Sequence, residues 1–277
     1  MSIRVGGLPA SPAHRAIDAA FAEVATVHRL MSFHQEDSDV SRLNRSAVRE
    51  PVAVHPHTLE VLSWAIKLSS CSNGCFDISV GAELVDWEFL PRPSARKCDP
   101  QGSWRDIELR SDGSVVFHRP LWIDLGGIAK GYAVDRASEI LRSWGAQCSV
   151  VNAGGDIRVN GKQAERIVLD TGSPASALAV LELSDGSVAS STGRRHRRRY
   201  RGRLLGPHLH GASRSPAPTE RFVCVVADRC VVADALTKVM IAEGVNGANL
   251  LRRFGASAHL HDPVLGWEHL EPEGKAS

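Results

Sequence analysis

Residues 123–135, IDLGGIAKGYAVD, restrict the fold of this chain more than any other stretch. The apolar residues 121–124, LWID, predict a strand, and Gly126 and Gly127 predict a sharp turn after it. Residues 128–144 then predict an amphipathic helix, because their apolar side chains recur at helical spacing: Ile128, Tyr132, Ala133, Ala137, Ile140 and Leu141.

This strand–turn–helix unit also suits an anion. Paired glycines let backbone amides approach a ligand closely, and the start of a helix favours negative charge. Lys130, in the first turn of the expected helix, could meet a phosphate or a carboxylate. Neither GxxxxGK[ST] nor GxGxxG is present. Taken alone, the segment fits an ordinary turn with a surface lysine equally well.

The rest of the chain mixes helices and strands. Helices are expected at residues 12–31, 57–70 and 230–244, each with apolar residues on one face, and the last closed by Gly244. Hairpins or strands are expected at 106–118, 148–161, 177–192 and, as the last strand, 221–227. Residues 31–44 and 91–103 are interpreted as polar turn and loop. This order predicts an α+β fold with largely antiparallel sheets, in one domain spanning 1–277 with its core at about 12–250.

Seven arginines stand within residues 194–203. Such a run is typical of nucleic-acid binding, yet the rest of the chain is net negative, because 33 Lys and Arg in all stand against 31 Asp and Glu. The run predicts a hairpin with arms 194–200 and 203–210, turning at Arg201-Gly202. Alternation would place Arg195, Arg197 and Arg199 on one side and Arg194, His196, Arg198 and Tyr200 on the other. A solvated hairpin, recognition of an acidic protein and, last, nucleic-acid binding remain open.

The compartment is expected to be the cytoplasm. No apolar run approaches the length of a membrane helix, and the first residues show neither a signal peptide nor a lipidated cysteine. The six cysteines form no CxxC pair and are expected to be reduced thiols.

Several further stretches could carry chemistry. In 74–81, GCFDISVG, Phe76 is expected in the core, whereas Asp77 could bind a ribose or a ring nitrogen. In 151–161, VNAGGDIRVNG, Asp156 is expected to accept hydrogen bonds from nearby amides. In 233–238, ADALTK, Asp234 and Thr237 share a helix face and offer the hard oxygen ligands that suit Mg²⁺, although an aspartate that starts a helix is the simpler interpretation.

Taken in chain order, these stretches resemble the FAD:protein FMN transferases of the ApbE family over residues 24–245. IDLGGIAKGYAVD and NAGGDIRV are the most specific parts. The resemblance implies a T-fold-like α+β domain with flanking helices. It also implies the transfer of FMN from FAD to a threonine or serine hydroxyl of an acceptor protein, with release of AMP and help from Mg²⁺.

The resemblance further implies roles for individual residues. The catalytic residues would be His208, as the base for the acceptor hydroxyl, and Asp234. The metal would be held by the Gly127 carbonyl, by Asp234, and by Thr237 or its neighbour Lys238. The flavin nucleotide would lie against Met31, Cys75, Phe76, Asp77, Asp124, Lys130, Leu209 and His210.

The sequence departs from the family pattern in two places. Where the family has His-Ile-Ile-Asp-Pro, residues 208–212 read His-Leu-His-Gly-Ala. Lys238 stands four residues after Asp234, where the family commonly has threonine or serine, and an ammonium there competes with a metal for the same negative charge. Two alternatives therefore remain: a metal-dependent FAD pyrophosphatase, and an FAD-binding homologue with reduced activity.

Overall fold

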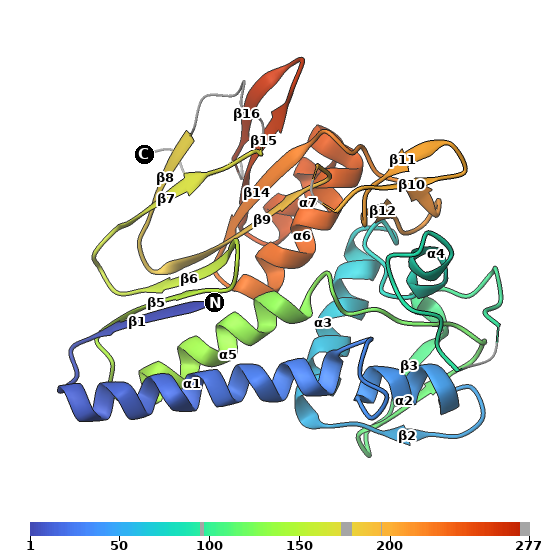
Figure 1. Ribbon diagram of the computed structural model, residues 1–277, viewed down its shortest axis with the longest axis horizontal. Helices are drawn as coiled ribbons and strands as arrows, with labels where there is room; N and C mark the ends of the chain where they lie inside the picture. Colours follow the sequence, from blue (N-terminus) through green and yellow to red (C-terminus); the bar gives the residue numbers. More distant parts are fainter. Residues whose placement is uncertain (95–96, 173–178, 195, 272–277) are drawn as a thin grey trace.

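The computed structural model describes residues 1–94, 97–172, 179–194 and 196–271, and it is built on a seven-stranded antiparallel sheet (Figure 1). The strand order is β1-β5-β6-β9-β14-β15-β16. Its strands are β1 Ser2–Gly6, β5 Cys148–Asn152, β6 Asp156–Asn160, β9 Gly186–Thr192, β14 Phe222–Ala227, β15 Ser257–Asp262 and β16 Gly266–Leu270.

Three long helices pack against this sheet and one another: α1 Ala10–Met31, α5 Ala129–Ser143 and α6 Cys230–Glu243. A second group of elements lies beside them at the right of Figure 1. It contains α2 Asp39–Ser46, α3 Pro56–Cys71, α4 Gly81–Asp86, and the small sheet of β2 Val52–Ala53, β4 Ser114–Phe117 and β3 Ile107–Leu109. A 3-10 turn at Trp104–Asp106 directly precedes β3.

The remaining strands and helices of the described residues are short. Three two-stranded sheets pair β7 Glu165–Leu169 with β8 Ala179–Leu183, β10 Arg198–Tyr200 with β11 Arg203–Leu205, and β12 Leu209–His210 with β13 Ser215–Pro216. A 3-10 turn at Gly244–Gly247 and helix α7 Ala248–Arg253 lead from α6 to β15. None of the described helices is long and apolar enough to cross a membrane.

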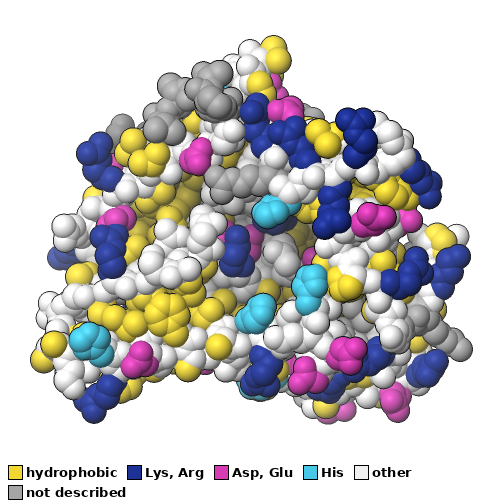
Figure 2. Space-filling model, in the orientation of Figure 1, with side chains coloured by type: hydrophobic (Ala, Val, Ile, Leu, Met, Phe, Trp, Pro, Cys, Tyr) yellow, Lys and Arg dark blue, Asp and Glu magenta, His cyan; other side chains and the backbone are white. Residues whose placement is uncertain are grey.

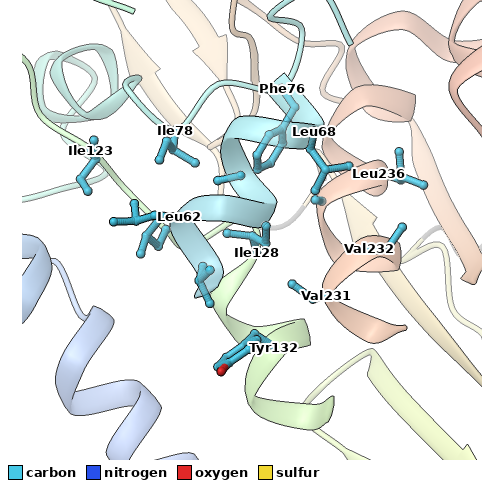
Figure 3. Packing of buried hydrophobic residues seen from close by; sticks show 14 of the residues in the cluster. Leu62, Leu68, Phe76, Ile78, Ile123, Ile128, Tyr132, Val231, Val232 and Leu236 are labelled. Atoms are coloured by element: carbon cyan, nitrogen blue, oxygen red, sulfur yellow. The ribbon is translucent and has the colours of Figure 1, made fainter. Parts of the chain in front are cut away.

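The main hydrophobic core lies between α3, α5 and α6 (Figure 3). The helical spacing of apolar residues in the sequence accounts for it, because each helix buries one stripe. Figure 3 shows members from all three helices, from the loop after α3 and from the residues before α5: Leu62, Leu68, Phe76, Ile78, Ile123, Ile128, Tyr132, Val231, Val232 and Leu236.

Helices α5 and α6 are in close backbone contact at Gly131. A Cβ atom at Gly131 would lie 2.3 Å from the Cys230 carbonyl oxygen, so only glycine permits this approach. Asp135 of α5 accepts hydrogen bonds from the first amides of α6, at 2.8 Å from Cys230 N and 3.0 Å from Val231 N. Asp234 of α6 accepts in return from Gly131 N at 3.0 Å. This exchange fixes where the side chains at the start of both helices point.

The structure confirms the predicted fold class and the four predicted helices, observed as α1, α3, α5 and α6, and it corrects several details. Residues 121–124 are extended but are not a strand, because their backbone bonds go to the side chain of Asn44 and to loop residues 78–81. Residues 31–44, expected as a polar turn, contain the start of α2. The strand at 222–227 is not the last, since β15 and β16 follow. Of the apolar residues of α1, Phe21 is 40% exposed, so it does not lie on the buried face.

The observed strand pairing differs from the predicted pairing, because several strands pair with strands that are far away in the sequence. The strands within 177–192 do not pair with each other: β8 pairs with β7, and β9 lies between β6 and β14. The arginine hairpin does turn at Arg201-Gly202, but its paired arms are only β10 and β11. Asp234 lies in the second turn of α6 rather than at its start, since α6 begins at Cys230. The six cysteines are free thiols.

Candidate functional site

A cavity of about 1140 Å³ opens beside α5, α6 and the sheet. This volume is slightly above the range of about 300–1,000 Å³ typical of ligand pockets, so the cavity has room for a dinucleotide-sized molecule. The sequence-predicted site residues that line it are Cys75, Phe76, Asp77, Asp124, Gly127, Lys130, His208, Leu209 and Lys238.

The remaining predicted residues lie close to this cavity or away from it. Asp234 and Thr237 are fully buried and contact the Lys238 side chain. Met31 is buried in the main core and is not among the lining residues. His210 faces Glu243 rather than the cavity, with Nε2 lying 3.5 Å from Oε1.

Lys238 is held by oxygen atoms on three sides. Its Nζ lies 2.9 Å from Asp234 Oδ1, 2.9 Å from Thr237 Oγ1 and 2.9 Å from Ser191 Oγ. Its aliphatic chain packs on Gly127, where a Cβ atom would lie 3.3 Å from Lys238 Cγ. A carboxylate and two hydroxyls are hard donors of the kind that Mg²⁺ takes. In this structure all three oxygens accept hydrogen bonds from the Lys238 ammonium. Mg²⁺ therefore does not fit at Asp234 Oδ1 while Lys238 stays in place.

Lys130, whose side chain is partly exposed, forms a second ion pair on the same side of the cavity, with a buried carboxylate. Its Nζ lies 3.2 Å from Asp156 Oδ2. Although burial alone would raise the pKa of Asp234, the ammonium groups of Lys238 and Lys130 keep it below its usual value. Two cations thus line the cavity at the junction of α5, α6 and β6, where they can meet an anionic ligand.

Sequence reasoning named Asp156 but did not predict its ion pair with Lys130. Asp156 is fully buried, and no backbone amide or hydroxyl of the described chain donates to its carboxylate. The expectation that it bonds to nearby amides is therefore wrong. Asn152 does this instead, accepting from Gly154 N at 2.9 Å. Burial and the neighbouring charge of Asp234 raise the pKa of Asp156 to about 8. The position of Asp156 after Gly-Gly in the motif was the only sequence signal for it.

His208 stands at the edge of this charged region as a neutral imidazole. Burial, assisted by the positive charge of Lys238, lowers the pKa of His208 to about 3. The loop that carries it is fixed at both ends, because His208 O accepts from Ala217 N at 3.0 Å and Cys75 O accepts from Gly211 N at 2.8 Å. At neutral pH the ring therefore has one protonated nitrogen and one free nitrogen, and the free nitrogen can accept a proton.

Asp77 and Asp124 already have protein partners. Asp77 Oδ1 accepts from Ser79 N and Oγ, both at 2.8 Å, and Oδ2 lies 3.3 Å from Arg214 Nη2. Burial raises the pKa of both carboxyls, and for Asp124 the opposing contacts are the Gly126 amide, His34 and Lys238. Both lie where a ligand in the cavity can reach them.

The arginine run reaches the cavity at one end only. His196, Arg197 and Arg198 line it, whereas Arg194 and Arg197 form ion pairs with Glu220. The predicted alternation is wrong, because the described strand is limited to 198–200 and His196 has a φ of 60°. Arg195 lies outside the described residues. On the face seen in Figure 2, Lys and Arg side chains gather at the upper right, over β10 and β11.

Proteins of one family are similar to this chain. Residues 1–260 match the ApbE family. A protein of Vibrio cholerae named FAD:protein FMN transferase is 30% identical over 234 residues, which covers 79% of this chain and 70% of that protein. A protein of Haemophilus influenzae with the same name is 29% identical over 199 residues, which covers 64% of this chain and 57% of that protein.

Solved structures share the fold. The flavinyl transferase ApbE of Pseudomonas stutzeri superposes with a TM-score of 0.79 at 21% identity, covering 98% of this chain and 93% of that one. The ApbE protein of Thermotoga maritima gives a TM-score of 0.82 at 23% identity, with the same coverage.

Proposed function

This chain belongs to the ApbE family, and we propose that it is a FAD:protein FMN transferase, which moves FMN from FAD to a threonine or serine hydroxyl of an acceptor protein. One observation carries the proposal within the structure. Lys130 and Lys238 line the same cavity as the neutral imidazole of His208, so charge neutralisation and proton acceptance are available at one place.

The reaction is a phosphoryl transfer at the pyrophosphate of FAD. The acceptor hydroxyl oxygen attacks the phosphorus of the FMN half, and a new P–O bond forms there. The bond from this phosphorus to the bridging oxygen breaks, and AMP leaves with that electron pair. The hydroxyl proton passes to His208, for which its neutral state is required. Catalysis of this kind depends mainly on positioning and on stabilising the charge of the phosphoryl oxygens.

We propose that the two lysines supply that stabilisation. Lys130 and Lys238 are held by Asp156 and Asp234, so their ammonium groups are in position before FAD binds. Phe76 and Leu209 offer apolar surface to the flavin ring, with Cys75, Asp77 and Asp124 around them. Met31 and His210 would then affect the flavin only indirectly, through packing.

Mg²⁺ has a smaller part in this proposal than the family resemblance implies. The donors expected to hold it are Asp234, Thr237 and the Gly127 carbonyl, and Lys238 already occupies the first two. An ammonium replaces part of the charge of a divalent ion but not its octahedral coordination. We therefore propose slow turnover with weak dependence on Mg²⁺.

The test is incubation of the chain with FAD and an acceptor domain that carries a candidate threonine, with and without Mg²⁺. Mass spectrometry should find FMN on the acceptor, and chromatography should find an equal amount of AMP. Free FMN with an unmodified acceptor would instead indicate hydrolysis of FAD, with water in place of the hydroxyl. Intact FAD bound to the protein would identify a homologue that has lost the chemistry.

A further inference from the structure

Cys75, His210 and Glu243 come together outside the charged region of Lys130 and Lys238. One ligand atom from each (a thiol sulphur, an imidazole nitrogen and a carboxylate oxygen) lies within 4.8 Å of the other two. The Glu243 carboxylate lies near the Cys75 thiol and raises its pKa, and His210 Nε2 lies 3.5 Å from Glu243 Oε1. None of the roles proposed above explains why these three side chains meet.

The three residues stand on separate, well-anchored parts of the fold. Cys75 follows α3, His210 is the second residue of β12, and Glu243 is the last residue of α6. The first two parts are pressed together at Gly211, where a Cβ atom would lie 2.5 Å from the Gly74 carbonyl oxygen. The backbone therefore holds the three side chains near one another, with their ligand atoms within 4.8 Å.

The charge at this place favours a cation. Glu243 lies at the carbonyl end of a 14-residue helix, where the helix dipole disfavours a carboxylate and favours positive charge. Arg221 donates to the Ile241 carbonyl oxygen at 2.6 Å, yet no Lys or Arg of the described residues forms an ion pair with Glu243. Within the described part of the chain, His210 is the one ion-pair partner of this carboxylate, while the Arg221 guanidinium packs against the following residue, Gly244.

The arrangement does not suit a nucleophilic cysteine. In a catalytic triad the histidine stands between the nucleophile and the acid. Here Glu243 takes the middle position and contacts both of the others. Burial and the carboxylate raise the pKa of the Cys75 thiol far above its usual value, whereas an activated thiol needs a lowered one.

We propose that Cys75, His210 and Glu243 form a binding site for a divalent transition-metal ion, with Zn²⁺ as the best match. Sulphur, imidazole nitrogen and carboxylate oxygen are the three ligand types that proteins offer to Zn²⁺, and three protein ligands leave a fourth position for water or substrate. A thiolate selects against Mg²⁺ and Ca²⁺, which prefer oxygen.

Binding requires a defined movement of protons. The Cys75 thiol loses its proton to solvent, and the sulphur–metal bond forms in its place. The imidazole stays neutral, with its single proton on Nδ1 once Nε2 binds the ion, which breaks the long contact of 3.3 Å from Ser213 N. Affinity should therefore fall as the pH is lowered. The bound ion would join β12, which begins one residue after His208, to α3 and α6.

The test is a Zn²⁺ titration of the purified chain without flavin, in excess Mg²⁺, against a chromophoric chelator. We expect one tight site per chain, weakened by more than about tenfold in each of Cys75→Ser, His210→Gln and Glu243→Gln, since even outer-shell changes cost that much. With Co²⁺, the wild type should show a thiolate charge-transfer band that Cys75→Ser lacks. Because no flavin is present, the result does not depend on the proposed function.

Two controls separate this site from other thiols and imidazoles. Cys148→Ser removes a half-buried thiol of β5, and His269→Gln removes one ring of the stacked His259–His269 pair, whose centroids lie 4.2 Å apart. Both should bind Zn²⁺ like the wild type. Circular dichroism checks that every variant is folded, and Glu243→Gln is nearly isosteric. The proposal is overturned if the wild type binds no Zn²⁺, or if Cys75→Ser and Glu243→Gln bind it unchanged.

Discussion

The ammonium nitrogen of Lys238 lies 2.9 Å from Oδ1 of Asp234, one helical turn earlier on α6. The same nitrogen lies 2.9 Å from the hydroxyl oxygens of Thr237 and Ser191. A side chain of this protein thus occupies the donors from which the family resemblance would assemble a metal site. Because the ammonium is covalently attached to α6, its charge is present at any concentration of metal ion.

This geometry predicts the effect of Lys238→Thr on metal dependence. Removing the ammonium frees Asp234 Oδ1 and adds a hydroxyl, so Mg²⁺ should bind more tightly and activate transfer more strongly. Lys238→Ala frees the carboxylate without the hydroxyl and should lose activity at low Mg²⁺. The measurement is the initial rate of FMN transfer against Mg²⁺ concentration for all three proteins. Tight, saturable activation of the wild type that the threonine variant does not improve would contradict the prediction.

The two histidines of the 208–212 segment should differ in their effect on transfer. His208 lines the cavity, so His208→Ala should reduce the rate by about 10²–10⁴-fold, the usual contribution of a general base. His210 contacts Glu243 instead, so His210→Ala should reduce it much less. Single-turnover rates with saturating FAD make the comparison independent of binding. If His210→Ala is the inactive variant, the base has been assigned to the wrong residue.

The state of His208 predicts a pH dependence of stability. In the folded protein burial lowers its pKa from 6.5 to about 3, whereas in the unfolded chain the imidazole takes up a proton near pH 6.5. Between these values the unfolded state binds more protons, so the free energy of unfolding should fall as the pH falls from 6.5 towards 3. Urea unfolding at several pH values should show a shallower fall for His208→Gln. Equal slopes would mean that the ring is protonated in the folded protein.

The cavity should distinguish FAD from FMN. The two phosphates of FAD can meet Lys130 and Lys238 together, whereas FMN offers a single phosphate, and the cavity of about 1140 Å³ has room for both halves of FAD. Titration by flavin fluorescence should therefore give one FAD per chain, bound more tightly than FMN. Lys130→Met should reduce this preference. Equal affinity of the wild type for the two flavins would count against a dinucleotide site.

Nucleic acid should bind only weakly and without sequence preference. The arginines of 194–203 are partly engaged, since Arg194 and Arg197 pair with Glu220. Any binding that remains should fall steeply with salt, because phosphate contacts release counterions. Electrophoretic shifts at several salt concentrations measure this. Nanomolar, sequence-selective binding at physiological salt would revive the interpretation of the run as a nucleic-acid site.

The sequence alone determined the features that depend on neighbouring residues. The helices at 12–31, 57–70 and 230–244 were predicted because apolar side chains recur at helical spacing, a signal within one segment. The hairpin at 106–118 followed from Ser-Asp-Gly between alternating residues. Most of the residues that the family resemblance indicated do line the cavity.

Tertiary structure decided what depends on contacts between distant segments. Residues 121–124 look like a strand in sequence, but Asn44 takes the backbone groups of Ile123, so no strand can pair there. Asp156 lies beside Lys130 only because β6 and α5 are in contact. Cys75 lies beside Glu243 only because the 74–81 loop lies against the end of α6. Local periodicity sets which residues form a helix, whereas the burial of several helices against one sheet sets which charges become neighbours. A single sequence carries no direct signal for the second.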